Sequence, residues 1–274
     1  MRFACRVFDK AWSWYQYKRP PRLVLPRVKR PDVVEGIRAI IRERPATYGY
    51  RRIHALLCGM GVRCDPKTVL RYMVLRLWLS TARMHRRKPG RRHEGVVAVP
   101  EPNTRWSSDI TGIKAWNGEK GRLAVILDCA DRQVLAYRWG RRIQASDIQD
   151  LVKEAMVKRL GTEQVKGLEF LSDNGSEYRE GVLMAFLNDA GFTICHTPVR
   201  SPESNGISES FFRGFKRDYV YQHECLSFED IGQHIGPWID DYNTKAPHGA
   251  LKMQTPAAFY AAWRLKTGDK LVQK

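Results

Sequence analysis

The chain has 274 residues, of which 43% are hydrophobic, and a formal net charge of +18. This length allows a sizeable core and more than one domain. No secretory leader and no apolar run of membrane-spanning length is present, which excludes secreted and membrane classes and predicts a cytoplasmic protein.

The excess positive charge is confined to the first third of the chain. Residues 1–100 contain 24 Lys+Arg against 6 Asp+Glu, whereas residues 101–274 contain 23 of each sign. A basic module ahead of a neutral one is expected when one part binds a polyanion and the other performs chemistry. A merely solvated basic surface is the alternative, but the size of the surplus favours nucleic acid.

Residues 1–30 are basic and aromatic, and their prolines indicate an extended connector towards the end. Their aromatic side chains suit either stacking on bases or a small helical docking segment, and both alternatives stay open. Residues 83–102 form a basic linker in which Arg86, Arg87 and Lys88 are expected to contact phosphates. A flexible solvated tether is compatible with the same composition.

Between these segments, apolar periodicity predicts helices over residues 32–44, about 49–59 and about 66–77. The second helix places Ile53, Leu56, Leu57 and Met60 on one stripe. Asp65 and Pro66 are typical of an N-cap followed by proline at the first helical position. We predict a helix-turn-helix domain at residues 31–82, with Lys67 and Arg71 directed towards DNA. The alternative is a three-helix bundle with solvated cations.

Strand patterns begin at residue 104. Three strands, over residues 105–111, 121–128 and 133–139, are separated by short turns and predict an antiparallel meander. A helix over about 146–160, with Ser146 as its cap, leads to a strand at 168–172, which a crossover makes parallel to the meander. A helix over about 180–190, a short strand at 192–196 and a helix starting near Glu209 complete an α/β domain at residues 103–220.

Residues 221–274 are predicted to form a helical extension packed on this domain. The Ser227–Asp230 segment is typical of a capping box, and a further helix is expected over about 255–266. The six cysteines include no Cys-x-x-Cys pair and no histidine partners at zinc spacing, so no structural zinc is expected. Cys129 and Cys195 are expected to be small core residues.

Three carboxylates occupy informative places in these elements. Asp109 lies in the first strand, Asp173 ends the strand at 168–172, and Glu209 starts a helix, with 35 residues between the last two. Enzymes that break phosphodiesters hold two hard divalent cations roughly 3.5–4 Å apart with such oxygen ligands. Asp128, Asp131, Glu177 and Glu203 are rival carboxylates; the first two are expected to satisfy a turn backbone.

The sequence motifs around these three acids resemble those of a known protein family. Trp106-Ser-Ser-Asp-Ile-Thr111, Ser172-Asp-Asn-Gly-Ser176 and Arg200-Ser-Pro-Glu-Ser-Asn-Gly-Ile-Ser-Glu209 resemble bacterial transposases of the insertion-sequence-three family, in its insertion-sequence-two group, and more distantly retroviral integrases. Tyr48-Gly-Tyr-Arg-Arg-Ile53 and the segment from Tyr242 to Pro256 fit the same family. The resemblance covers roughly residues 45–260, in the right order.

The resemblance implies a ribonuclease-H-like fold and an enzyme that cleaves and transfers DNA strands. Asp109, Asp173 and Glu209 would then be catalytic and hold two Mg²⁺ ions, with Mn²⁺ as a substitute. Asn174 would orient Asp173, with a role in an Asp-Asn-Gly turn as the alternative. Lys216, seven residues after Glu209, would contact DNA together with Arg213. An ordinary surface ion pair between Glu209 and Arg213 is the alternative for that stretch.

The implied partners are the ends of a mobile element, its target DNA, and further copies of the chain in a nucleoid-associated assembly. The family commonly joins a first-frame product to this half, so a first-frame partner or fusion is also expected. Two other functions stay open: a catalytically silent DNA-binding repressor, and a ribonuclease-H-like nuclease without strand transfer. His248 is expected to be a buried capping histidine, with DNA contact as the alternative.

Overall fold

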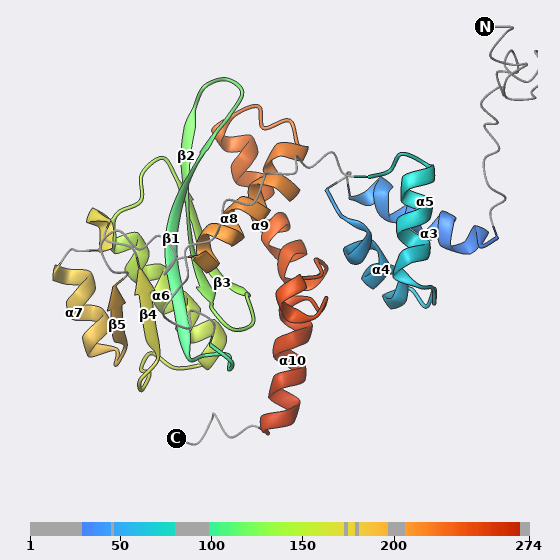
Figure 1. The fold of residues 1–274 in the computed structure, drawn as a ribbon. Coiled ribbons are helices and arrows are strands. Elements are labelled where there is room, and N and C mark those ends of the chain that lie inside the picture. The colour runs from blue at the N-terminus through green and yellow to red at the C-terminus, as the bar shows by residue number, and fades with distance from the viewer. Residues whose placement is uncertain are drawn as a thin grey trace, which may run out of the picture.

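The computed structural model describes residues 29–44, 47–79, 99–172, 175–178, 181–196 and 206–268. The first part is a small helical unit, made of α3 (Pro31–Glu43), α4 (Tyr50–Gly59) and α5 (Pro66–Leu75) (Figure 1). Val33, Ile37, Ile53, Leu57 and Met73 are among its fully or almost fully buried side chains. These three helices lie where the periodicity placed them.

Local capping explains where α5 starts. The Asp65 carboxylate accepts a hydrogen bond of 2.7 Å from the backbone N–H of Lys67, and Pro66 takes the first helical position, as expected. The prediction that Met60 shares the buried stripe of α4 is wrong, because the helix ends at Gly59 and the Met60 side chain is 57% exposed.

The second part is built on a five-stranded sheet with the strand order β3-β2-β1-β4-β5. Its strands are β1 (Arg105–Lys114), β2 (Lys120–Asp128), β3 (Val134–Gly140), β4 (Glu169–Ser172) and β5 (Thr193–His196). The first three form an antiparallel meander; β4 pairs in parallel with β1, and β5 pairs in parallel with β4. The predicted mixed α/β order is therefore confirmed.

Helices cover both faces of this sheet (Figure 1). One face carries α6 (Ala145–Leu160), η1 (Ser176–Tyr178) and α7 (Gly181–Asp189); the other carries α8 (Gly206–Asp218), η3 (Val220–Gln222) and α9 (Phe228–Thr244). The chain continues through η4 (Gly249–Leu251) to α10 (Pro256–Thr267). Ser146 does not cap α6. The helix begins at Ala145, and the carboxylate of Asp147 accepts a hydrogen bond of 2.8 Å from the Gln144 N–H.

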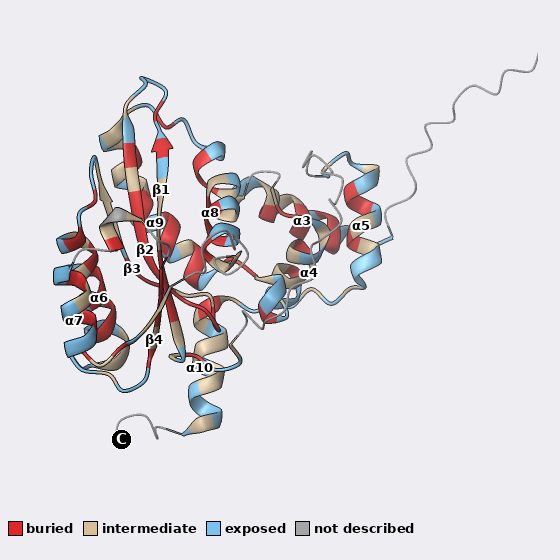
Figure 2. Ribbon diagram, turned by 60° about the vertical axis from the view of Figure 1, so that its left-hand side comes forward, coloured by how far each residue is buried: buried red, intermediate tan, exposed pale blue. Residues whose placement is uncertain are grey.

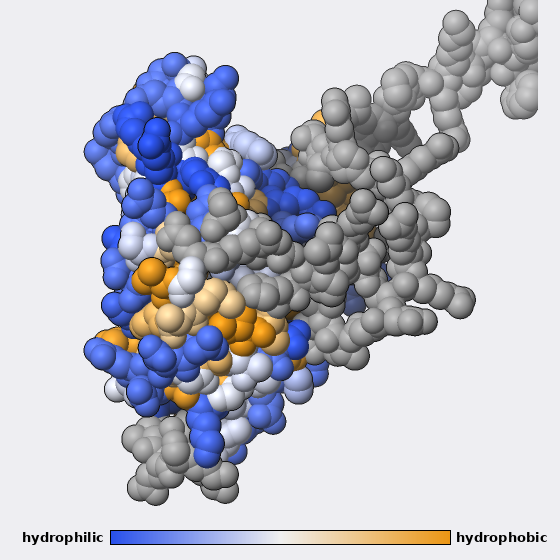
Figure 3. Space-filling view, turned by 90° about the vertical axis from the view of Figure 1, so that its left-hand side faces the viewer, coloured by the Kyte–Doolittle hydropathy of each residue, from blue (hydrophilic) through white to orange (hydrophobic). Residues whose placement is uncertain are grey.

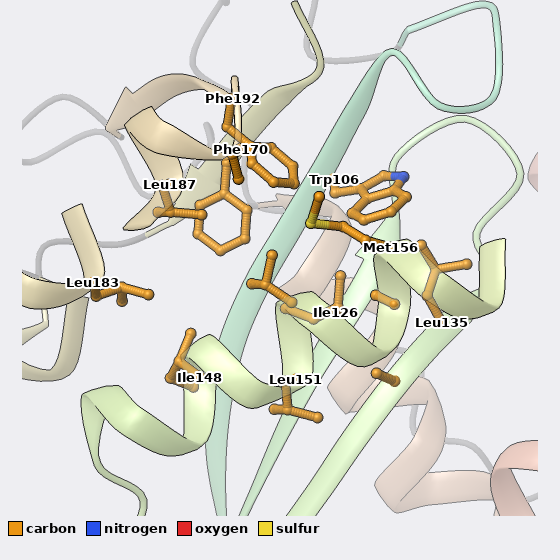
Figure 4. Packing of buried hydrophobic residues seen from close by; sticks show 14 of the residues in the cluster. Trp106, Ile126, Leu135, Ile148, Leu151, Met156, Phe170, Leu183, Leu187 and Phe192 are labelled. Atoms are coloured by element: carbon orange, nitrogen blue, oxygen red, sulfur yellow. The ribbon is translucent and has the colours of Figure 1, made fainter. Parts of the chain in front are cut away.

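The core under α6 and α7 is aromatic at one end (Figure 4). Trp106 of β1 is fully buried, with its ring centroid 6.0 Å from that of Phe192, which in turn lies 5.8 Å from Phe170. Burial of this kind fixes β1 against β4, because each large aromatic side chain removes substantial apolar area from water. Buried residues gather in the sheet and on the helix faces turned towards it, while parts of β1 and β3 are half-buried or exposed (Figure 2).

The opposite core sets the position of α8. Phe212 and Phe215 of α8 pack with Trp238 and Tyr242 of α9 over the buried β2 residue Val125. The side-chain amide of Asn243 adds a two-way link to the edge strand, accepting from the N–H and donating to the C=O of Val134, both at 2.9 Å. Of the two predicted C-terminal helices, α9 therefore completes this hydrophobic layer of the sheet, whereas α10 lies against α9.

Outside these cores the surface is mixed. The face on the α7 side of the sheet is hydrophilic at its upper end and gathers hydrophobic side chains in its middle (Figure 3). None of the helices in the described ranges is both long and apolar enough to cross a bilayer. Cys129 and Cys225 are buried free thiols, as expected for the first, whereas Cys195 is only half-buried.

Candidate active site

Asp109 lies on the face of β1 that α8 covers. Alternate residues of a strand share a face, so Asp109 points to the same side as Ser107 and Thr111. The Ser208 hydroxyl of α8 donates to the Ser107 hydroxyl at 3.0 Å, and both residues are fully buried. Helix α8 therefore contacts β1 two residues before Asp109.

The same helix touches β1 again just beyond Asp109. The Lys216 ammonium donates to the hydroxyl of Thr111 and to the carbonyl of Gly112, both at 2.8 Å. Burial lowers the pKa of Lys216 from its ordinary value. The side chain is thus a positioned cation that fastens α8 along β1, on the Asp109 face.

Glu209 follows Ser208 directly and is exposed in the first turn of α8. Its helix neighbours Phe212 and Phe215 are buried, so the apolar flank anchors the helix and leaves the carboxylate in solvent. Asp109 is half-buried, and its Oδ1 accepts a hydrogen bond of 2.8 Å from the N–H of Ile110. The structure brings the two elements that carry these acids together.

The third acid follows β4. In the parallel register of β1 and β4, Ser108 pairs with Ser172. Asp173 and Asn174 come next in the chain and lie outside the described residues. After them, the Tyr178 hydroxyl of η1 is 2.9 Å from the Ser108 hydroxyl, so the chain on both sides of Asp173 and Asn174 is fastened to β1 beside Asp109.

The rival carboxylates have other partners. Asp128 and Asp131 are fully buried and accept hydrogen bonds from turn N–H groups, as expected, including that of Ala130 at 2.8 Å. The Arg159 guanidinium also pairs with Asp131. Glu177 is paired with Arg122 at 2.5 Å. Glu203 lies outside the described residues.

The predicted DNA contacts fall in several places. Lys67 and Arg71 are exposed on α5, as expected, and Arg86, Arg87 and Lys88 lie outside the described residues. Arg213 is exposed and, together with Arg52 and Arg132, lines a cleft of about 460 Å³ between the helical unit and the core. Among the described residues, Glu209 and Arg213 form no ion pair.

Sequence reasoning missed the parts of this site that depend on tertiary contact. Ser107 and Ser208 lie inside the sequence motifs. These motifs identify the neighbouring acids as candidate ligands but do not predict the contact between the two serine hydroxyls. Arg52 and Arg132 are separated by 79 residues in the chain and meet only at the cleft. The sequence shows that both residues are positively charged, but no sequence pattern predicts that they lie close together.

His248 is a structural residue in the turn after α9. It is the N-cap residue of η4, and its carbonyl accepts from the N–H groups of Leu251 and Met253 at 3.0 and 2.8 Å. The residue is half-buried and its side chain makes no cap hydrogen bond to η4, so the expected buried capping side chain is not found there. Its ring stacks edge-on against Tyr242, with centroids 4.5 Å apart. Burial, reinforced by the positive charge of Arg52, lowers the pKa of His248 to about 4, so the ring is neutral at pH 7.

Comparisons with known proteins agree with this architecture. Two family models, each described as an integrase core domain, match residues 99–202 and residues 190–256. The structure also resembles a chain in the intasome of simian T-cell lymphotropic virus in complex with the PP2A regulatory subunit B56 gamma, with a TM-score of 0.51 and 16% identity over 82% of this chain and 74% of that chain. The fold therefore defines a protein with a ribonuclease-H-like integrase core.

Relatives with higher sequence identity show to which family of integrase-core proteins the chain belongs. The chain is 36% identical over 236 residues to the transposase InsD of insertion element IS2 from Escherichia coli, covering 83% of this chain and 78% of the relative. It is 41% identical over 178 residues to an uncharacterised protein of insertion element IS136 from Agrobacterium fabrum, covering 64% of this chain and 91% of that relative. The chain belongs to the family of insertion-element transposases with an integrase core. It is a DNA transposase, and its enzyme class is that of the polynucleotidyl transferases; the silent and nuclease-only alternatives are not favoured.

Proposed function

We propose that Asp109, Asp173 and Glu209 form the catalytic centre of this transposase. The observation that carries the proposal is the double attachment of α8 to β1, through Ser208 before Asp109 and Lys216 beyond it. A helix fastened in this way keeps Glu209 on the Asp109 face of the sheet. Asp173 follows Ser172, whose partner in the sheet is the residue before Asp109. Asn174 is proposed to orient Asp173.

Divalent metal use goes with this enzyme class, and the donor set suits it. Carboxylate oxygens are the ligands preferred by Mg²⁺, and Asp109 and Glu209 are both at least partly accessible. The described residues contain no group of three His, Cys, Asp or Glu side chains that could hold a metal, and Asp173, the third proposed ligand, lies outside them. Two Mg²⁺ ions, with Mn²⁺ as a substitute, would activate the attacking oxygen and stabilise the leaving oxygen.

The residues of this chain supply the rest of the mechanism. The carboxylates of Asp109 and Glu209 provide negative charge on two rigid elements, so little reorganisation is needed when the DNA arrives. Lys216 lies on the same face and is proposed to hold a phosphate of the DNA. Attack by water and then by a 3′-hydroxyl on phosphorus requires no covalent link between protein and DNA.

The remaining basic residues are proposed to position the substrate. Lys67 and Arg71 of the helical unit, Arg86, Arg87 and Lys88 of the linker, and Arg213 of α8 would neutralise phosphates of the element ends and target DNA. Two ends joined in one reaction imply more than one copy of the chain, so a homo-oligomer at the nucleoid is proposed. A first-frame partner or fusion would then contribute to end recognition.

The function is tested by incubating the protein with labelled element ends and a target duplex. We expect joined products with Mg²⁺ or Mn²⁺ and none after the metal is removed with EDTA, while the DNA remains bound. Nicked ends without joined products would support a nuclease instead. Shifted bands without cleavage in any metal would support the silent DNA-binding protein and contradict the proposal.

Lys216→Ala is expected to weaken binding of the element end about tenfold and to reduce the salt dependence of binding by about one ion, since one phosphate contact is lost. Binding is measured by fluorescence anisotropy over a salt series. Thr111→Val is the matched control, because it removes one hydrogen bond of Lys216 and keeps the charge. Equal losses in the two variants, with an unchanged salt dependence, would mean that Lys216 only positions α8.

A further inference from the structure

A second cleft lies at the far end of α8, where the helix leaves β1. It has a volume of about 400 Å³, and its lining includes Lys114, Trp116, Lys216 and Tyr221. Both aromatic side chains are largely in solvent, Trp116 with 67% and Tyr221 with 71% of its surface exposed. Large exposed aromatic groups that share one cleft are typical of binding surfaces.

The two aromatic segments are held against each other by backbone hydrogen bonds. The β1–β2 hairpin extends beyond the rest of the sheet (Figure 1). Trp116 lies in its turn, between the end of β1 at Lys114 and the start of β2 at Lys120, and its N–H donates to the carbonyl of Cys225 at 2.8 Å. Asn117 donates in the same way to Leu226 at 3.3 Å. Tyr221 belongs to η3, four residues before Cys225. The cleft is therefore assembled before any ligand arrives.

The hairpin tip itself is rigid. The side chain of Asn117 accepts from the N–H of Glu119 at 3.0 Å and donates to its carboxylate at 2.7 Å. The carboxylate of Glu119 also accepts from the N–H of Phe228 at 3.1 Å, and Arg141 donates to it at 2.8 Å. Gly118 takes the left-handed conformation that the turn requires, at φ +92°. Trp116 is thus presented on a fixed support.

Charge identifies the ligand class. Lys114 is exposed, and Lys216 uses two of its three donors on Thr111 and Gly112, which leaves one donor for a ligand. Two cations beside two exposed aromatic rings fit a phosphate joined to a flat, stackable group. Because Lys216 also borders the Asp109 face, the cleft continues the surface on which the DNA is proposed to lie.

We propose that this cleft binds an unpaired nucleobase of the DNA, stacked on Trp116 or Tyr221, with its phosphate held by Lys114 and Lys216. The inference rests on the proposed function, because it takes Lys216 to be a DNA contact. A base within a duplex is covered on both faces by its neighbours, so only a flipped or frayed nucleotide presents a free face to these rings. The cleft would hold DNA whose end has opened near the catalytic centre.

The test uses the full chain in EDTA, where no strand is cut, and an oligothymidine strand carrying one 2-aminopurine. Stacking on an aromatic side chain quenches 2-aminopurine fluorescence, so the signal reports the base directly. We expect Trp116→Ala or Tyr221→Ala to reduce quenching and weaken binding about tenfold. Trp116→Phe and Tyr221→Phe keep an aromatic ring and are expected to retain both the quenching and the binding affinity. Leu265→Ala, at a side chain that is 87% exposed on α10, is the control and should change neither.

Three results would overturn the inference: no quenching in the wild-type chain, quenching that survives both alanine substitutions, or an equal loss with phenylalanine and alanine. Circular dichroism of each variant separates loss of stacking from loss of fold. The assay needs no catalysis, so strand transfer without quenching would refute the base cleft and leave the catalytic proposal intact. Quenching without strand transfer would support the base cleft and contradict the catalytic proposal.

Discussion

Asp109→Asn, Asp173→Asn and Glu209→Gln are each expected to lower strand transfer about 10³-fold or more. Each substitution keeps the size of the side chain but removes one negative oxygen ligand from the metal site. Metal-ion catalysis contributes several kcal/mol of transition-state stabilisation, and each 1.36 kcal/mol corresponds to a factor of about ten in rate. The rate is measured with labelled ends and Mg²⁺. Binding of the uncut DNA should change little, because its phosphates are held by basic residues.

Two control carboxylates make this prediction specific. Asp150→Asn alters an exposed acid on α6, on the opposite face of the sheet, and should leave strand transfer unchanged. Glu177→Gln tests the nearest rival, whose partner is Arg122, and is expected to have a much smaller effect than Glu209→Gln. Full activity of the Glu209→Gln enzyme would show that another residue supplies the third ligand.

The element order and the buried faces could be predicted from the sequence, because both depend on local patterns. The apolar periodicity of residues 32–44 and about 49–59 shows which side of each helix is apolar, and burial follows that division, with Ile37 and Leu57 fully buried. The N-cap at Asp65 was predictable for a similar reason, since it involves only neighbouring residues.

Two of the predictions that were wrong concern the residue at which a helix begins or ends. Met60 continues the apolar stripe of α4 in sequence, but the helix ends at Gly59 and the side chain leaves the core. Ser146 is a common N-cap residue type, yet Asp147 caps the backbone one turn earlier. Helix ends are set by competing hydrogen bonds of similar free energy, and a shift of one residue changes which side chain is used.

The candidate site was predictable as a set of acids, but its attachment to the fold was not. Nothing in the spacing of Ser107 and Ser208, or of Thr111 and Lys216, shows that they touch, since about a hundred residues separate the members of each pair. The exposed pair Trp116 and Tyr221 is equally distant in sequence. Such contacts form only when α8 and η3 pack against β1 in the folded protein.

The junction between the helical unit and the core is a second place where distant charges meet. Arg44 donates two hydrogen bonds to the carboxylate of Asp241 on α9, at 2.6 and 2.7 Å, and the hydroxyl of Tyr219 donates to the same carboxylate at 2.9 Å. Only 13% of the Arg44 side chain and 23% of the Asp241 side chain are exposed. Arg52 forms a parallel pair with Asp218 at 2.6 Å.

Two ion pairs span this junction. Ala246 is the core residue that packs into the hydrophobic cluster of the helical unit, and a cavity of about 300 Å³ remains beside Arg44 and Asp241. We expect the docked position to depend on the two charge pairs. Paired charges with limited exposure are screened less by salt than surface pairs, and breaking one leaves its partner without compensation.

A double-mutant cycle is therefore expected to give a coupling free energy of about 1–3 kcal/mol between Arg44 and Asp241. The cycle uses Arg44→Gln, Asp241→Asn and the double variant, with the free energy of unfolding measured in urea. Arg30 and Asp32, whose side chains are 45% and 49% exposed within the helical unit, form the matched control pair and should show no measurable coupling. Small-angle scattering of Asp241→Asn should show a larger radius of gyration as the helical unit separates. Additive effects at Arg44 and Asp241, with an unchanged radius, would mean that other contacts hold the two parts together.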